Sequence, residues 1–224
     1  SVITIITQYG ELLLRAMGQT LLLALCGLFF ACIIGLVFGM MSVLKSKVCR
    51  AIAQIFVDIV RGVPMIVLAF FVFFGVPYFF KNVLGNNITL SALTAGTICL
   101  ALNCGAYMAE IIRAGIQSVD KGQMEAARSL GLTYWKSMRK VVLPQAIRTM
   151  IPSIINQFII TLKDTSILSV IGFPELVNSA KNVVAITFKS FETWLIVGIM
   201  YLIIITALSK LAKVLERRLN RGRQ

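Results

Sequence analysis

The sequence has no histidine and few charged residues. Asp, Glu, Lys and Arg make up 14% of its 224 residues, whereas about a quarter is usual for a soluble domain. The absence of histidine excludes this residue as a general base and as a metal ligand. The five cysteines lack the spacing of metal ligands or of a disulfide framework, and we interpret them as small packing residues. No metal site is therefore expected.

Hydrophobic residues are abundant instead. They make up 58% of the chain, and several apolar runs are long enough to cross a bilayer as a helix, which takes about 20 residues. The sequence therefore predicts an all-α, polytopic membrane protein. The net charge of +13 does not indicate nucleic-acid binding, because the Lys and Arg residues cluster between and after the apolar runs. The five expected spans are residues 20–44, about 52–80, 88 to about 112, about 145–171 and about 193–211.

The distribution of basic residues predicts the orientation of these spans. The first loop, the central insert and the C-terminal tail carry fourteen Lys and Arg residues, against three in the other two connections. Basic residues are enriched in cytoplasmic loops. The N-terminus is therefore expected outside, and the insert and the C-terminus in the cytoplasm.

The longest polar stretch in the middle of the chain is the insert at residues 120–144, between the third and fourth spans. Its charges must face water, and the pattern at 123–138 predicts a helix broken near Gly131. Leu143-Pro144 then restarts the next span, since proline is tolerated in the first turn of a helix. Two interpretations are open: short helices that dock on a partner in water, or an amphipathic helix that rests on lipid headgroups.

Within this insert the residues resemble a known motif. Glu125-Ala126-Ala127, then Gly131, then Val141-x-Leu143-Pro144 is similar to the EAA loop of ABC-transporter permease subunits, with Val141 where isoleucine is more usual. Further motifs resemble the polar amino acid branch of that family, which takes up glutamine, histidine, arginine, glutamate and related substrates. They are Arg61-Gly62-x-Pro64, Gly105-Ala106-Tyr107-x-x-Glu110-x-x-Arg113-x-Gly115, Lys121-Gly122-Gln123, Leu143-Pro144-Gln145-Ala146 and Lys163-Asp164-Thr165-Ser166.

The resemblance implies that the whole chain, residues 1–224, is one transmembrane permease domain in a bacterial cytoplasmic membrane. It implies a second permease subunit, identical or different, two cytoplasmic ATPase subunits and an extracytoplasmic amino-acid-binding protein, free or tethered. The chain has no Gly-x-x-x-x-Gly-Lys-Ser/Thr loop, so ATP and Mg²⁺ are expected on the ATPase partners and no catalysis or cofactor on this chain. The residues expected to couple to an ATPase are Gly122, Glu125, Ala126, Ala127, Gly131, Leu143 and Pro144.

Polar residues inside the spans are candidates for substrate contact, because ionisable groups in a membrane are expensive. An amino acid needs an anionic partner for its ammonium and a cation or donor for its carboxylate. Asp164 and Lys163 supply one of each, and hydrogen bonds are expected from Thr165, Ser166 and Asn103. The alternative is a buried structural ion pair and hydrogen bonds between helices.

Two further pairs of charged residues lie near the expected cytoplasmic ends of spans: Asp58 with Arg61, and Glu110 with Arg113. A spacing of three allows each pair to interact within its helix, or the charges can pair between helices as part of a gate. We expect a gating or structural role. The alternative functions, a channel or a membrane-embedded enzyme without an ATPase partner, are disfavoured by the insert and by the lack of histidine, cysteine pairs and clustered carboxylates.

Overall fold

The computed structural model describes residues 1–221, so Arg223, counted above in the basic tail, lies outside the described residues. These residues contain no β-strand, as predicted. The helices are α1 (Val2–Met41), α2 (Lys47–Gly62), α3 (Met65–Phe70), α4 (Val76–Val83), α5 (Ala92–Gln117), α6 (Lys121–Ser129), α7 (Tyr134–Ser137), α8 (Leu143–Asp164), α9 (Leu176–Thr187) and α10 (Ser190–Arg221). Five helical stretches are long and apolar enough to span a membrane, at Val2–Met41, Met65–Val83, Ala92–Gln117, Tyr134–Ile171 and Ser190–Arg221.

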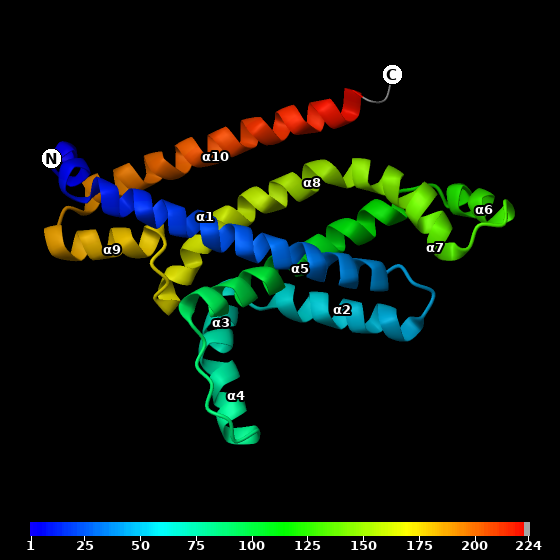
Figure 1. Cartoon of the computed structure of the whole chain (residues 1–224), viewed down its shortest axis with the longest axis horizontal. Helices are drawn as coiled ribbons and strands as arrows, with labels where there is room; N and C mark the ends of the chain where they lie inside the picture. Colours follow the sequence, from blue (N-terminus) through cyan, green and yellow to red (C-terminus); the bar gives the residue numbers. More distant parts are fainter. Residues whose placement is uncertain (222–224) are drawn as a thin grey trace.

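The centre of the fold is the pairing of α1 with α5 (Figure 1). Gly27, Gly35 and Gly39 recur along one buried face of α1. A Cβ atom on Gly35 would lie 2.5 Å from the Cβ of Met108 in α5, and one on Gly39 would lie 2.8 Å from the Cβ of Ile112. The two backbones thus approach closely only because these side chains are missing.

The expected second span, residues 52–80, is wrong as one continuous helix. The chain forms α2, breaks at Val63-Pro64 and resumes as α3. Val63 and Pro64 have ψ angles of 130° and 138°, which are extended rather than helical. Proline disfavours the helical conformation of the residue before it and has no N–H for a helical hydrogen bond. Residues 2–19, which precede the expected first span, are by contrast continuous with it in the single helix α1.

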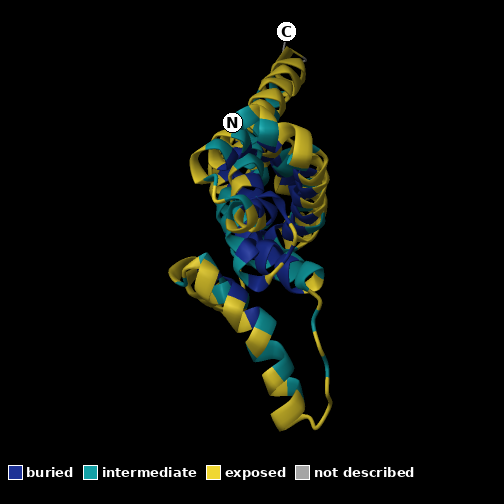
Figure 2. Cartoon of the chain, turned by 90° about the vertical axis from the view of Figure 1, so that its left-hand side faces the viewer, coloured by how far each residue is buried: buried dark blue, intermediate teal, exposed yellow. Residues whose placement is uncertain are grey.

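The segment after this break forms an arm that leaves the bundle. α3 continues through a π-helical stretch, Phe71–Gly75, into α4, and the arm runs across the direction of α1 and α5 (Figure 1). Its outer part is mostly exposed (Figure 2), and several of its exposed residues are aromatic, including Phe71, Phe74 and Tyr78. Aromatic surface of this kind suits lipid or another membrane subunit better than water.

The insert has the predicted break. α6 ends before Gly131, which has a φ of +84°, a conformation that glycine adopts without strain. After it, α7, a π-helical stretch at Met138–Val142, α8 and a final 3-10 stretch form one helical segment from Tyr134 to Ile171. Leu143 and Pro144 lie in the first turn of α8, as expected. Gly131 is therefore the hinge point between α6 and a single long helix.

The connection between the fourth and fifth spans contains α9, anchored by buried polar groups. Glu175 is fully buried, and its carboxylate accepts hydrogen bonds from the backbone N–H groups of Val177 (2.9 Å) and Asn178 (2.6 Å) at the start of α9. The N–H of Leu176, the first residue of α9, donates to the Thr20 hydroxyl of α1 at 2.9 Å. These bonds satisfy N–H groups that a helix start leaves unpaired and fix α9 against α1.

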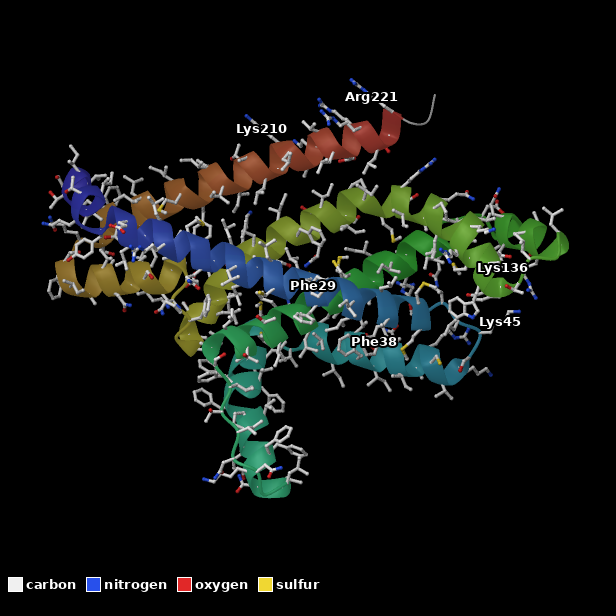
Figure 3. All side chains as sticks on the ribbon, in the orientation of Figure 1. Phe29, Phe38, Lys45, Lys136, Lys210 and Arg221 are labelled. Carbon is white, nitrogen blue, oxygen red and sulfur yellow. The ribbon has the colours of Figure 1, made fainter. Side chains whose placement is uncertain are left out.

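The basic clusters gather at one end of the molecule. Lys45 follows α1, Lys136 lies in α7 and Arg221 ends α10, and all three lie toward the same end in Figure 3. The α6–α7 region lies at this end too, opposite the N-terminus of α1 (Figure 1).

Candidate functional site

Two neighbouring hollows lie between α2, the start of α3, α5 and α8. The first, here the arm-side hollow, has a volume of about 500 Å³ and reaches the α2–α3 break. The second, the insert-side hollow, has a volume of about 430 Å³ and lies nearer the end of α5 and the start of α8. Both volumes fall in the ~300–1,000 Å³ range of small-molecule pockets.

The arm-side hollow combines the helix break with polar side chains from two helices. The break contributes five consecutive residues, 61–65. The helical hydrogen bonds of α2 end at the Val63 N–H, and those of α3 begin at the Pro64 carbonyl. Asn103 of α5 and Gln157 and Asp164 of α8 also line it. Both amide-bearing residues are over nine-tenths buried, whereas Asp164 is half-buried. The hollow thus brings together one carboxylate, two amides and the Arg61 side chain, in a lining of mixed polar and apolar residues.

The insert-side hollow contains a charged cluster. The Arg113 guanidinium donates to both carboxylate oxygens of Glu110, at 2.8 Å and 3.3 Å. Arg61 of α2 reaches across to the same carboxylate, with an N–O distance of 4.0 Å. Glu110 therefore pairs both with Arg113 of its own helix and with Arg61 of α2. Asp58 does not pair with Arg61; it accepts a hydrogen bond from the Gln54 amide at 2.7 Å.

Three side chains line both hollows: Arg61, Tyr107 and Gln157. The guanidinium carbon of Arg61 lies 5.0 Å from the centroid of the Tyr107 ring, within the range of a cation–π interaction. The two hollows are thus adjacent, and these three residues stand between them.

The structure separates the predicted substrate-contact residues. Asn103 and Asp164 both line the arm-side hollow. Lys163 is exposed and lines neither hollow. Thr165 is buried and Ser166 half-buried, and their hydroxyls donate to the backbone carbonyls of Leu162 (2.6 Å) and Lys163 (2.8 Å). Asp164 and Lys163 therefore point to different surroundings, as adjacent residues on a helix do.

The predicted coupling residues divide into an exposed and a buried set. Glu125, Ala126 and Gly131 are exposed, as are Gly122 and Pro144. Ala127 is buried against its own chain, with 4% of its surface accessible, and Leu143 is half-buried. The exposed set lies on α6, at the hinge and at the start of α8. It adjoins Leu130, whose side chain is 84% exposed. The end of the insert thus exposes a charged, a small and a large apolar side chain side by side.

The sequence reading did not place Tyr107 and Gln157 at the site. The helical spacing of the sequence could have indicated both residues. Tyr107 is four residues after Asn103, and Gln157 is seven before Asp164, so each shares a helix face with a residue that was selected. Among residues 1–221, no group of three or more Cys, Asp or Glu side chains is placed to hold a metal ion.

Comparison with known proteins places these features in a family context. Residues 8–221 match the family described as binding-protein-dependent transport system inner membrane component. The glutamine transport system permease protein GlnP of Escherichia coli (strain K12) is 36% identical over 208 residues, covering 93% of each chain. A probable amino-acid ABC transporter permease protein, YckA of Bacillus subtilis (strain 168), is 35% identical over 205 residues, covering 92% of this chain and 88% of the relative.

Solved structures show the same fold. A chain in the crystal structure of an amino acid ABC transporter with histidines superimposes with a TM-score of 0.86 at 37% identity, and the match covers 97% of this chain and 98% of the other. A chain of the inward-facing MetNI methionine ABC transporter gives a TM-score of 0.76 at 20% identity, over 93% and 96% of the two chains. At that lower identity the likeness concerns the fold alone.

Proposed function

Because the chain belongs to the family of binding-protein-dependent transport system inner membrane components and is the permease subunit of an amino acid ABC importer, we propose that it carries a polar amino acid through the two hollows. The observation that carries this proposal is the arm-side hollow, where Asp164 and Asn103 meet at a helix break. Irregular backbone at membrane depth is tolerated only where it is buried in protein or lines a cavity, and binding sites of membrane transporters use broken helices in this way.

The chemistry of the arm-side hollow suits an amino acid backbone. The Asp164 carboxylate pairs with the substrate ammonium, and the Asn103 and Gln157 amides donate hydrogen bonds to its carboxylate. The carbonyl end of α2 adds partial negative charge beside the ammonium. Lys163, exposed outside the hollow, is not needed for this arrangement.

The residues shared by the two hollows form a gate in this proposal. Arg61 is held by the Tyr107 ring and by Glu110, which in turn is fixed by Arg113. Substrate passes from the arm-side to the insert-side hollow only when Arg61 leaves these contacts. In this proposal Arg61 and Glu110 act at the pathway, whereas Asp58, which accepts a hydrogen bond from Gln54, does not.

Replacing Arg61 by alanine should raise amino acid flux through the assembled transporter in the absence of ATP. A cation–π contact and a part-exposed ion pair contribute about 1–2 kcal/mol, so an increase of roughly tenfold is expected. The measurement is efflux of labelled amino acid from proteoliposomes without nucleotide. Arg50→Ala, which removes an exposed arginine of the same helix, is the control. Equal flux in the two variants would remove the gate.

The insert is proposed to dock on the ATPase through Glu125, Ala126, Leu130 and Gly131. All four are exposed at one end of the molecule, and small residues beside an exposed leucine suit a shallow groove. Ala127 acts indirectly, because its side chain packs inside this chain. Gly131 permits the turn that presents α6, and Leu143-Pro144 begins the helix that leads to Asp164.

Glu125→Lys should weaken association with the ATPase without preventing membrane insertion. The Glu125 side chain is exposed, so charge reversal leaves the fold unchanged but places a like or unpaired charge in the docked interface, at a cost of several kcal/mol. Co-purification of the ATPase with the permease would fall by about 100-fold or more. Lys121→Glu, a reversal at the start of the same helix, is the comparison. Wild-type association in Glu125→Lys would contradict docking at this face.

The remaining assembly follows from the same premise. We propose an N-terminus outside and a cytoplasmic insert and C-terminus; the clustering of Lys45, Lys136 and Arg221 at one end supports this orientation. The whole chain acts as one permease domain in a bacterial cytoplasmic membrane, beside a second permease subunit and below an amino-acid-binding protein. ATP and Mg²⁺ act on the ATPase partners. Fluorescent labelling of single cysteines at the two termini in intact cells tests the orientation, and a labelled cytoplasmic end would overturn it.

A further inference from the structure

A second, entirely apolar groove lies away from the two hollows. It is formed by α1, α8 and α10 and has a volume of about 470 Å³. Leu25 and Leu28 line it from α1, Phe158 and Ile159 from α8, and Leu211 and Leu215 from α10. Among the described residues, every side chain that lines it belongs to Leu, Ile, Phe or Ala. The groove shares no residue with the pathway hollows.

The helix faces that line this groove lead to arginines at one end. On α8, Arg148 is seven residues before Ile155, another lining residue; on α10, Arg218 is seven residues after Leu211. A separation of seven places two residues on the same helix face. α8 and α10 run in opposite directions (Figure 1), so the start of α8 and the end of α10 lie toward the same end of the groove. Both arginines are exposed.

An apolar groove alone would not select a ligand in a membrane, because lipid tails are as apolar as leucine. The two arginines supply the selectivity. The planar guanidinium matches a phosphate with two parallel hydrogen bonds, and two of them from different helices can hold one phosphate group. Lys210 and Arg221 extend the positive charge along α10 (Figure 3).

A second copy of this chain is a poorer occupant on grounds of charge. The chain has 22 Lys and Arg residues against nine Asp and Glu. A second copy would bring mostly further positive charge to the two arginines, whereas an anionic lipid brings the complementary charge. Arg221 at the end of α10 lies toward the same end of the molecule as Lys45 and Lys136 (Figure 3), and an anionic membrane surface attracts such basic residues.

We propose that this groove binds an anionic phospholipid, with one acyl chain between α1, α8 and α10 and the phosphate between Arg148 and Arg218. The lipid joins α8, which carries Asp164, to α10, and so steadies the helix that links the insert to the pathway. The site stands independently of the substrate assigned to the hollows.

The test is lipid retention by the intact transporter complex in detergent. Native mass spectrometry compares phosphatidylglycerol and phosphatidylcholine with identical acyl chains. We expect preferential retention of phosphatidylglycerol, lowered by about 10- to 100-fold in the double variant Arg148→Gln/Arg218→Gln, the range expected for loss of charge-assisted hydrogen bonds. Arg217→Gln, which removes one positive charge on another face of α10, should retain the lipid as the wild type does. Equal loss in both, or no preference in the wild type, would overturn the proposal.

Unmodified protein gives an independent reading if the double variant fails to assemble. Phosphatidylglycerol with a photoreactive acyl chain should label residues of the groove, around Phe158 and Leu211, as located by peptide mass spectrometry. Labelling confined to the α3–α4 arm would overturn the site. Leu211→Trp places a large side chain in the groove. If this variant changed the association of permease subunits and left lipid retention unchanged, a second copy would be the occupant and the proposal would be overturned.

Discussion

Gly35→Leu should prevent α1 from pairing with α5 and remove most of the folded protein from the membrane. A Cβ at this position already lies 2.5 Å from the Met108 Cβ and 3.3 Å from the Gly105 carbonyl oxygen. The obstacle includes backbone, so no side-chain rotation relieves it. Inserting even a few methylenes into a packed interface typically costs about 1–3 kcal/mol. A whole leucine side chain should cost more, against a total stability of about 5–15 kcal/mol.

Gly18→Leu on the same helix is the matched control. A Cβ there meets nothing within 4 Å, and Gly18 is exposed, so this change should leave the yield and the melting temperature of the detergent-extracted protein unchanged or slightly raised. Gly35→Ala should fall between the two, with a loss of about 1–3 kcal/mol. Equal yields for Gly35→Leu and Gly18→Leu would mean that α1 and α5 are not locked together by their glycines.

Asp164→Asn should lower ATP-dependent amino acid uptake by about 10- to 100-fold while the complex with the ATPase still assembles. The change keeps the size of the side chain and removes the charge that pairs with the substrate ammonium. A hydrogen bond to a charged group contributes about 1.5–3 kcal/mol, and about 1.4 kcal/mol corresponds to a factor of ten. Uptake is measured in proteoliposomes that contain the ATPase, with the binding protein supplied.

Lys163→Gln distinguishes the site proposed from the structure, which excludes Lys163, from the site expected from the sequence alone, which included it. Both residues were candidates for substrate contact, but only Asp164 lines the arm-side hollow. Lys163→Gln should therefore transport at close to the wild-type rate. A larger defect in Lys163→Gln than in Asp164→Asn would contradict the assignment, as would unchanged apparent affinity for the amino acid in Asp164→Asn.

The features that depend on local chemistry could be read from the sequence. The five apolar stretches follow from composition, and the hinge at Gly131 follows from a glycine between two helical patterns. The break at Val63-Pro64 was equally local, because proline constrains the residue before it. It was missed because the apolar run on its far side suggested that the helix continued through it.

The features that depend on distant contacts could not be read in this way. Nothing local specifies that the arm after Pro64 turns across the bundle, since its direction is set by packing of α3 against α5 and the stretch after α8. That Arg61 reaches the Glu110 carboxylate and the Tyr107 ring likewise depends on how α2 lies on α5. Charge spacing allowed this pairing but offered pairing within each helix as well.

The length of α1 ties the pathway to the thickness of the bilayer. Its 40 residues give a path along the helix axis of about 60 Å at 1.5 Å per residue, about twice the hydrocarbon core of ~30 Å. A helix longer than the core adjusts to a thinner or thicker bilayer by changing its tilt. Because Gly35 and Gly39 hold α1 directly against α5, α5 must tilt with it and carry Asn103 and Tyr107 along. Membranes of different thickness would thus present the proposed transport site at different tilts.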